Sequence, residues 1–290
     1  MRRACIDIGS NTTRLLIADC DGQRLAEVHQ ERSFTHVRRG LTPDEEIAED
    51  KIAEVVAVVV GQLAVARELG VEDVRCVATA AVRQAANRDA LVAAVRGACG
   101  LEIRVLSAEE EARLAFGGAA RTLAGVPAGP LGVVDVGGGS CEMVVGMVPD
   151  QVAWFASFEL GSGQLADECL PSDPPSTEEL DRARARVNDV LNGVKPPPVA
   201  RVVAVGGSAT SLRRIAGSWL DAVVFARVLD LLAAERAADV AQHFGLDADR
   251  VRLLPAGLLI LEAAAARFGA PLEVGLGGLR EGLLLEMSDG

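Results

Sequence analysis

One short segment occurs twice in this chain, and it constrains the fold more than any other feature. The first copy reads Asp7-Ile8-Gly9-Ser10-Asn11-Thr12-Thr13, and the second, 128 positions later, reads Asp135-Val136-Gly137-Gly138-Gly139-Ser140-Cys141. Apolar residues of the β type flank each copy, which predicts a strand, a tight turn and a second strand. Gly allows backbone N–H groups to converge on one point, and Ser and Thr hydroxyls add donors. The sequence therefore predicts two anion-binding turns.

The Asp that begins each copy indicates a cation beside the anion. A carboxylate cannot itself contact a phosphate, but its oxygens bind divalent cations directly or through water. We therefore expect Asp7 and Asp135 to help hold a metal ion, with the two turns clamping a phosphate chain. The alternative is that both residues only brace tight turns.

Length and composition favour two soluble domains. The chain has 290 residues, half of them hydrophobic, and the repeat spacing predicts domains at 1–124 and 125–290, joined by a Gly- and Pro-rich hinge at 125–130. We expect no membrane span and, because Asp7 interrupts any signal-peptide core, a cytoplasmic location. The net charge of −12 argues against nucleic acid as a partner. The six cysteines and three histidines show no metal-ligand or redox spacing.

The order of the expected elements predicts the fold class. The first half indicates strands near 3–9, 13–19 and 24–30, a helix at 49–69, a strand at 74–78, a helix at 81–98, a strand at 101–106 and a helix from Glu109. The second half repeats the opening with strands near 131–135, 141–147 and 151–159, and adds strands at 201–205 and 272–274 and a last helix from Leu279. This is the order of a ribonuclease-H-like unit. We therefore expect an α/β fold of two such domains flanking a cleft, with sites at strand ends.

Six motifs in order resemble those of the exopolyphosphatase/guanosine pentaphosphate phosphohydrolase (Ppx/GppA) family, a branch of the actin, sugar-kinase and Hsp70 superfamily. The motifs lie at Asp7–Thr12 with Arg14-Leu15, Ala78–Asn87, Glu109–Leu114, Asp135–Glu142, Gly206–Thr210 and Gly278–Leu283. The resemblance covers nearly the whole chain. It implies release of terminal phosphate from inorganic polyphosphate, and of pppGpp to ppGpp in the stringent response, with Mg²⁺ or another divalent cation. It also implies a short form of the family without a C-terminal HD-type domain.

The resemblance assigns roles to individual residues. It implies that Glu111 activates the attacking water and that Asp135 and Glu142 hold the metal, with Asp7 helping. The implied phosphate ligands are Ser10, Asn11, Thr12, Arg83, Gly138, Gly139, Ser140, Gly207 and Ser208. In-line attack of water on a phosphoryl group requires such carboxylates, metal and donors. Plainer explanations remain for Glu111 and Arg83. Glu111 could occur at the start of a helix only because the macrodipole favours acidic residues there, and Arg83 could be a surface residue.

Two residues depart from the family pattern, and two other functions stay open. Ala108 stands where relatives usually have Gly, and Cys141 where they usually have Thr, which would weaken a phosphate donor. The first alternative function is an ATP-dependent kinase of the same superfamily. The second is a non-catalytic regulator that binds ppGpp or polyphosphate, against which the intact Glu111, Asp135 and Glu142 argue. A homodimer is left open, and the basic pair Arg38-Arg39 is as consistent with substrate steering as with plain surface.

Overall fold

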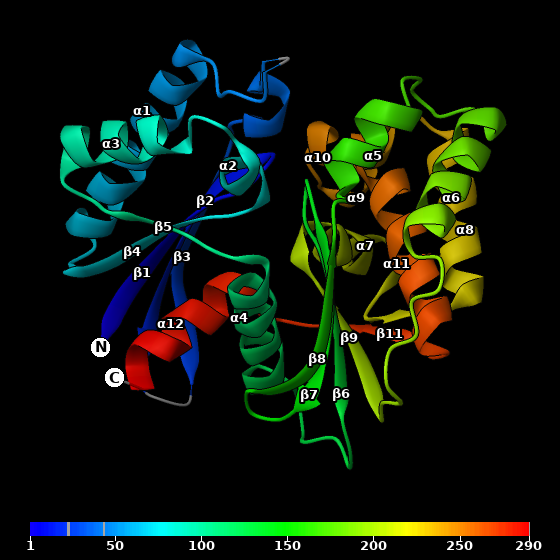
Figure 1. Cartoon of the computed structure of the whole chain (residues 1–290). Helices are drawn as coiled ribbons and strands as arrows, with labels where there is room; N and C mark the ends of the chain where they lie inside the picture. The colour runs from blue at the N-terminus through cyan, green and yellow to red at the C-terminus, as the bar shows by residue number, and fades with distance from the viewer. Residues whose placement is uncertain (22–23, 43, 290) are drawn as a thin grey trace. The chain divides into compact units, whose positions relative to one another are not determined.

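The computed structural model describes residues 1–21, 24–42 and 44–289. The chain divides into two units: unit 1 comprises Met1–Leu114 with Leu279–Gly290, and unit 2 comprises Ala115–Gly278. Each unit has its own sheet and its own helices (Figure 1).

Unit 1 contains a five-stranded sheet in the order β3-β2-β1-β4-β5. Its elements are β1 (Arg2–Ile8), β2 (Thr12–Cys20), β3 (Leu25–Phe34), the 3₁₀ helix η1 (Val37–Gly40), α1 (Glu49–Glu68), β4 (Asp73–Ala78), α2 (Ala80–Gln84), α3 (Arg88–Cys99), β5 (Ile103–Val105), the start of α4 (Ala108–Arg121) and α12 (Leu279–Asp289). The central strand β1 is antiparallel to β2 and parallel to β4.

Alternate residues of β1 supply two different cores, because successive side chains of a strand point to opposite faces of the sheet. Ala4, Ile6 and Ile8 pack in a cluster with residues of α1 and α3. Cys5 packs in a second cluster with Leu284 of α12. The same alternation places Asp7 on the face that α12 covers.

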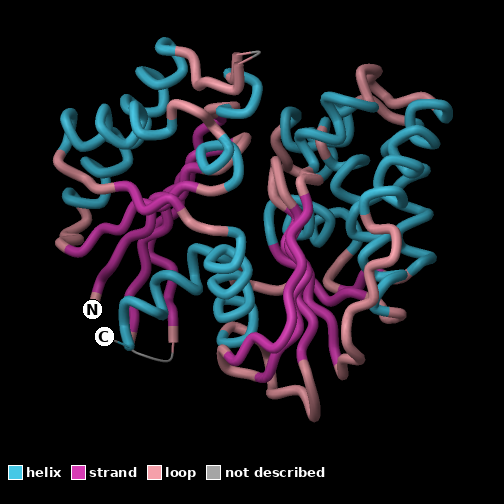
Figure 2. Tube along the Cα trace, in the orientation of Figure 1, coloured by secondary structure: helices cyan, strands magenta, loops and turns pink. Residues whose placement is uncertain are grey.

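Unit 2 contains a six-stranded sheet in the order β10-β11-β9-β6-β7-β8, shown with its helices in Figure 2. Its elements are β6 (Leu131–Val136), β7 (Cys141–Met147), β8 (Gln151–Phe158), α5 (Ser162–Cys169), α6 (Thr177–Val190), β9 (Arg201–Val205), α7 (Gly206–Ala216), β10 (Trp219–Leu220), α8 (Ala222–Ala234), α9 (Ala237–Phe244), α10 (Ala248–Arg252), α11 (Leu254–Phe268) and β11 (Leu272–Val274). Val134 and Val136 of β6 pack in the main helical core. Asp135, between them, lies on the opposite face of the sheet.

The predicted fold class is confirmed, because the order β3-β2-β1-β4-β5 of unit 1 recurs in unit 2 as β8-β7-β6-β9-β11. The division of the chain differs from the expected domains 1–124 and 125–290. It falls inside α4, between Leu114 and Ala115, so the expected hinge at 125–130 lies within unit 2. Residues 279–290 belong to unit 1, because α12 buries Leu279, Leu283 and Leu284 against the sheet of that unit.

One local prediction was wrong, and one short strand was not predicted. The helix expected at 81–98 is interrupted between α2 and α3, where Asn87 Oδ1 accepts from the backbone N–H of Ile47 (2.8 Å) and Asn87 Nδ2 donates to its carbonyl (2.9 Å). The short edge strand β10 was not expected.

No helix in the described part of the chain is both long and apolar enough to cross a membrane.

Candidate active site

The two copies of the repeated segment fold into the same turn, as predicted. In unit 1 the N–H of Gly9 donates to the carbonyl of Thr12 at 3.0 Å, and in unit 2 the N–H of Gly137 donates to the carbonyl of Ser140 at 2.9 Å. A Cβ at Gly9 would lie 3.0 Å from the Thr12 oxygen, and one at Gly137 would lie 3.3 Å from the Ser140 oxygen. At both first glycines a side chain would therefore make a tight contact with the turn's own backbone.

In unit 2, helix α5 holds the carbonyl groups of the turn. The N–H of Ser162 donates to the Gly137 carbonyl (2.9 Å), and the N–H groups of Gly163 and Gln164 donate to the Gly138 carbonyl (3.0 and 3.1 Å). Because a trans peptide points its N–H opposite to its C=O, the N–H groups of Gly138 and Gly139 face away from α5. These amides are thereby oriented as a pair of donors for an anion.

Gly161 permits this close approach of α5. A Cβ at Gly161 would lie 2.2 Å from both the carbonyl carbon of Gly138 and the nitrogen of Gly139. Sequence reasoning did not identify Gly161, because the contact joins segments that are more than twenty residues apart.

In unit 1, the segment after β3 holds two carbonyl groups of the turn, those of Ser10 and Asn11. The N–H of Arg38 donates to the Ser10 carbonyl at 3.1 Å, and the N–H groups of Thr35 and His36 donate to the Asn11 carbonyl at 3.1 and 3.0 Å. Ser10, Asn11 and Thr12 are all less than a tenth exposed, and Asn11 Nδ2 is buried without a hydrogen-bond partner among the described residues. The predicted phosphate-binding turn of unit 1 therefore contains an unused buried donor.

Asp7, at the end of β1, lies in a charged environment. Its Oδ1 is buried and has no hydrogen-bond partner among the described residues. Burial raises the pKa of Asp7, and this rise is opposed by the positive charges of Arg280 and Arg14. Neither arginine was assigned a role from the sequence, although both lie in motifs that carried the family resemblance.

Glu111 is buried in the same unit and paired with an arginine. It is 7% exposed, and its Oε2 accepts from Arg83 Nη1 at 2.8 Å. The same nitrogen donates to the Leu106 carbonyl at 2.9 Å, so Arg83 is not a free surface residue. Burial raises the pKa of Glu111, the hydrogen bond and charge of Arg83 oppose that rise, and the charge of Asp7 adds to it. A carboxylate whose pKa is moved toward neutral suits a general base.

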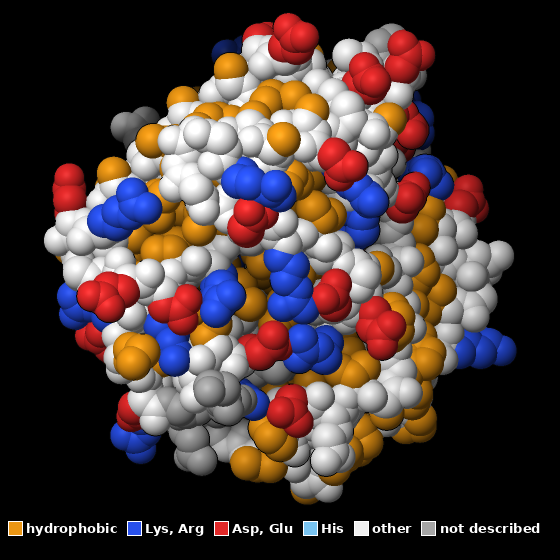
Figure 3. All heavy atoms as spheres, turned by 60° about the vertical axis from the view of Figure 1, so that its left-hand side comes forward, with side chains coloured by type: hydrophobic (Ala, Val, Ile, Leu, Met, Phe, Trp, Pro, Cys, Tyr) orange, Lys and Arg blue, Asp and Glu red, His pale blue; other side chains and the backbone are white. Residues whose placement is uncertain are grey.

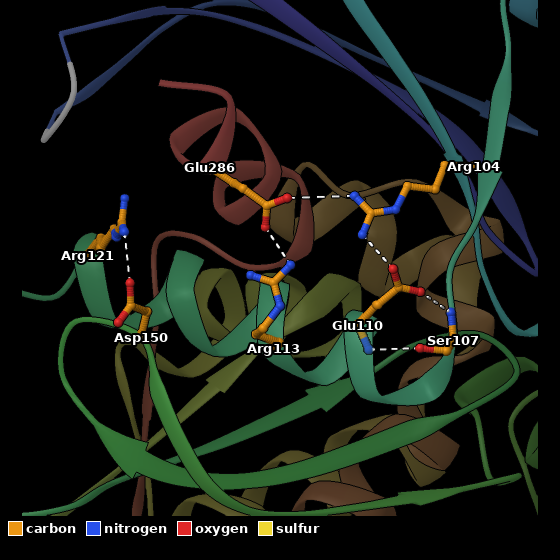
Figure 4. A network of polar contacts seen from close by, with 7 residues as sticks. All are labelled: Arg104, Ser107, Glu110, Arg113, Arg121, Asp150 and Glu286. Atoms are coloured by element: carbon orange, nitrogen blue, oxygen red, sulfur yellow. Dashed lines mark hydrogen bonds and ion pairs between the residues drawn. The ribbon is translucent and has the colours of Figure 1, made fainter. Parts of the chain in front are cut away.

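The neighbouring Glu110 has a different role (Figure 4). Its Oε2 accepts from the N–H of Ser107 at 2.8 Å, and its own N–H donates to Ser107 Oγ at 3.2 Å, which caps the start of α4. Arg104 also donates to Glu110, and these bonds lower the pKa of Glu110 to about 2. On α12, Glu286 pairs with Arg104 at 3.6 Å and with Arg113 at 2.5 Å. This network ties α4, which carries Glu111, to α12, which carries Arg280.

In unit 2, two carboxylates face each other on neighbouring strands. Asp135 of β6 is paired in register with Glu142 of β7. Glu142 is 1% exposed, and its Oε1 accepts from Ser157 Oγ at 2.9 Å. A Cβ at Gly206, whose φ is +88°, would lie 2.5 Å from Asp135 Oδ1, so the start of α7 packs closely against this carboxylate.

The two copies of the repeat differ in the residue that lies opposite the Asp. At the 128-residue offset, Glu142 corresponds to Arg14, which is paired in register with Asp7. Unit 1 thus sets an arginine opposite its Asp, whereas unit 2 sets a second carboxylate there. Like charges on a buried pair of strands are unfavourable unless a cation or a proton lies between them. Among the described residues, no group of three His, Cys, Asp or Glu side chains could hold a metal ion by itself.

Gly207 and Ser208, the two expected phosphate ligands of unit 2 outside the repeated turn, lie at the start of α7. Gly207 lies in the first turn of α7, where backbone N–H groups favour an anion. Ser208 is fully buried, and a Cβ at Gly257 of α11 would lie 2.2 Å from its Oγ. The Ser208 side chain therefore lies against α11, and its Oγ is buried without a hydrogen-bond partner among the described residues. Its expected contact with phosphate stays a prediction.

The two departures from the family pattern cause no conflict. Cys141 is fully buried in the helical core of unit 2, where burial raises the pKa of its thiol well above the usual value. A donor to phosphate is therefore not lost at this position. Ala108 is not among the described non-Gly residues with positive φ, so it does not strain the start of α4.

On the face shown in Figure 3, Lys and Arg side chains are interspersed with Asp and Glu side chains. Long-range attraction of a polyanion is therefore weak for a chain of net charge −12. Binding of an anion has to depend on local donors such as the turn amides and Arg14, Arg83 and Arg280.

The sequence matches the model of the Ppx/GppA phosphatase family over residues 16–289. The chain belongs to this family. It is 32% identical to exopolyphosphatase 2 of Mycobacterium tuberculosis over 91% of this chain and 90% of that protein. Among solved structures, the Ppx/GppA family member of Aquifex aeolicus is 29% identical, with a TM-score of 0.83 over 99% of this chain and 97% of that one. An exopolyphosphatase of Cytophaga hutchinsonii, 22% identical over 100% of this chain and 98% of that one, shares the fold with a TM-score of 0.87.

Proposed function

We propose that this Ppx/GppA chain is an exopolyphosphatase, a hydrolase that releases the terminal phosphate of inorganic polyphosphate. The observation that carries the proposal is Glu111, a buried carboxylate with a raised pKa, held by Arg83 in the unit that contains the Asp7–Thr12 turn. The names of the mycobacterial relatives, exopolyphosphatases 1 and 2, support the choice of substrate.

Glu111 is the general base of the proposed reaction. Its carboxylate takes a proton from the attacking water as the water oxygen bonds to the terminal phosphorus, and the bond to the bridging oxygen of the remaining chain breaks. Arg83 orients the carboxylate through its 2.8 Å hydrogen bond and lowers its pKa, so that the ionised form is available. General bases of this kind contribute about 10²–10⁴-fold to the rate.

The two turns bind the phosphate groups. In unit 1 the donors are the backbone of Ser10, Asn11 and Thr12 and the unused Asn11 Nδ2. In unit 2 the donors are the amides of Gly138 and Gly139 and the Ser140 hydroxyl, and Gly207 adds an amide at the start of α7. Such donors are strongest toward ionised oxygens, because charge-assisted hydrogen bonds are about twice as strong as neutral ones.

Asp135 and Glu142 would hold the divalent cation, which we propose to be Mg²⁺, and the expected help of Asp7 stays a prediction. The residues fit such an ion: the facing carboxylates of unit 2 offer hard oxygen ligands, and Asp7 Oδ1 has no hydrogen-bond partner among the described residues. Among the described residues no group of three His, Cys, Asp or Glu side chains is placed to hold the ion, so phosphate oxygens and water would supply its other ligands. When bound, the ion neutralises charge on the phosphate oxygens.

The function is tested by measuring phosphate release from long-chain polyphosphate, tripolyphosphate, pppGpp and ATP at saturating Mg²⁺. Polyphosphate should be hydrolysed fastest, and pppGpp, which ends in the same phosphoanhydride, is the second candidate substrate. A Glu111→Gln preparation serves as the control for contaminating phosphatases. Release from none of the four substrates would contradict the proposal, and transfer of phosphate from ATP to an acceptor would favour the kinase alternative.

A further inference from the structure

A chain of buried polar groups lies beneath the turn of unit 1. Helix α1 packs on the sheet with the apolar residues Val55, Val59, Leu63 and Ala66, but the same buried face also contains Gln62, which is 1% exposed. The Nε2 of Gln62 donates to the Thr13 carbonyl at 3.2 Å. Burying a polar side chain in an apolar core costs free energy unless the side chain is hydrogen-bonded. The hydrogen bond to Thr13 offsets only part of the cost of burying Gln62.

The chain continues to the turn itself. The hydroxyl groups of Thr13 and Thr35, both fully buried, are hydrogen-bonded at 3.0 Å. The N–H of Thr35 in turn donates to the Asn11 carbonyl at 3.1 Å. These three hydrogen bonds, linked through the covalent bonds of Thr13 and Thr35, connect α1 with the peptide group between Asn11 and Thr12.

Comparison of the two repeats shows why unit 1 needs these side chains. In unit 2 the N-terminal amides of the eight-residue helix α5 hold the turn carbonyls. In unit 1 the corresponding segment leads into η1, a 3₁₀ helix of only four residues. At the 128-residue offset, Thr13 corresponds to Cys141, which has no hydroxyl group. The hydroxyl pair thus occurs only in the repeat whose turn lacks a supporting α-helix.

We propose that Thr13 and Thr35, anchored by Gln62, are positioning residues for the phosphate-binding turn of unit 1. The hydroxyl pair fixes the position of the Thr35 amide, and that amide fixes the Asn11 carbonyl. Because the peptide is planar and trans, the Thr12 N–H is fixed as well. None of the three side chains touches substrate. This inference rests on the proposed function, since it concerns the same turn.

The decisive experiment compares Thr35→Val with the double variant Thr13→Val/Thr35→Val. The single variant leaves one buried hydroxyl without its partner, which lowers thermal stability. The double variant replaces both partners by apolar groups of the same shape, so much of that stability should return. We expect KM for polyphosphate to rise about 3–10-fold in both variants, with kcat changed less than twofold, because a lost neutral hydrogen bond corresponds to about that factor.

Two controls complete the design. Thr35→Ser keeps the hydroxyl and should restore the KM of the wild type. Thr122→Val removes a hydroxyl that donates to the Gly118 and Ala119 carbonyls of α4, at 2.7 and 3.3 Å, and should leave KM unchanged. If KM recovers together with stability in the double variant, the pair is merely structural and the inference is overturned. A wild-type protein that releases no phosphate would instead refute the proposed function.

Discussion

Gly161→Ala should damage the site of unit 2 by displacing the backbone of its phosphate-binding turn, although Gly161 itself binds no substrate. The added Cβ would lie 2.2 Å from two backbone atoms of the Gly138-Gly139 peptide, whereas real Cβ contacts essentially never fall below 3.0 Å. The difference, 3.0 − 2.2, means that the turn or α5 must move by at least about 0.8 Å. Both elements are backbone, so neither can rotate away as a flexible side chain would.

The magnitude follows from this displacement. Misplacement of a reacting group by about 1 Å can cost about 10²-fold in rate, and overpacking of a tight site costs about 1–3 kcal/mol of stability. We therefore expect kcat/KM for polyphosphate to fall about a hundredfold, together with a lower melting temperature. The assay is phosphate release at saturating Mg²⁺, with thermal unfolding followed by circular dichroism.

The matched control is Gly97→Ala in α3. A Cβ at Gly97 would have no neighbour within 4 Å, so the same substitution adds helix propensity without a clash. Its kcat/KM should equal that of the wild type. If Gly161→Ala also retains the activity and stability of the wild type, then close packing by α5 does not set the position of the turn, and the reasoning fails.

Three further outcomes are expected. Arg83→Gln removes the group that lowers the pKa of Glu111, so the acidic limb of the pH–rate profile should move to higher pH. If the limb does not move, Arg83 does not control the pKa of the general base. Asp135→Asn should raise the Mg²⁺ concentration needed for half-maximal activity, and an unchanged requirement would make Asp135 structural. Asp7→Asn should raise the melting temperature near neutral pH while lowering activity. Burial raises the folded-state pKa of Asp7, which penalises its ionised form at pH values above that pKa, so a lower melting temperature would contradict this account of Asp7.

Local patterns predicted most of the architecture, because strand alternation and helical periodicity are properties of neighbouring residues. The break between α2 and α3 could not be predicted in this way, since it depends on hydrogen bonds from Asn87 to the backbone of Ile47, forty residues away. The assignment of α12 to unit 1 likewise depends on packing against β1 and β2, and an amphipathic pattern does not name its partner.

The site residues likewise divide into those that local sequence patterns could predict and those that depend on distant contacts. The two turns were visible because the sequence repeats, and aligning the repeats would also have revealed that Arg14 and Glu142 occupy equivalent positions. Gly161 could not be found, because only the folded chain brings it against Gly138. Ser208 was assigned to the site by its motif, but the sequence could not show that its Oγ lies against Gly257 of α11.

The central claim is that Glu111 activates the attacking water, and it is tested most directly by comparing Glu111→Gln with Glu109→Gln. Both glutamates lie in the first turn of α4, but Glu109 is exposed and Glu111 is buried against Arg83. In Glu111→Gln, kcat for polyphosphate should fall by about 10²–10⁴-fold, the usual contribution of a general base, while the affinity for polyphosphate changes little. Glu109→Gln should behave as the wild type. A Glu111→Gln protein that turns over at the wild-type rate would contradict the assignment of the base.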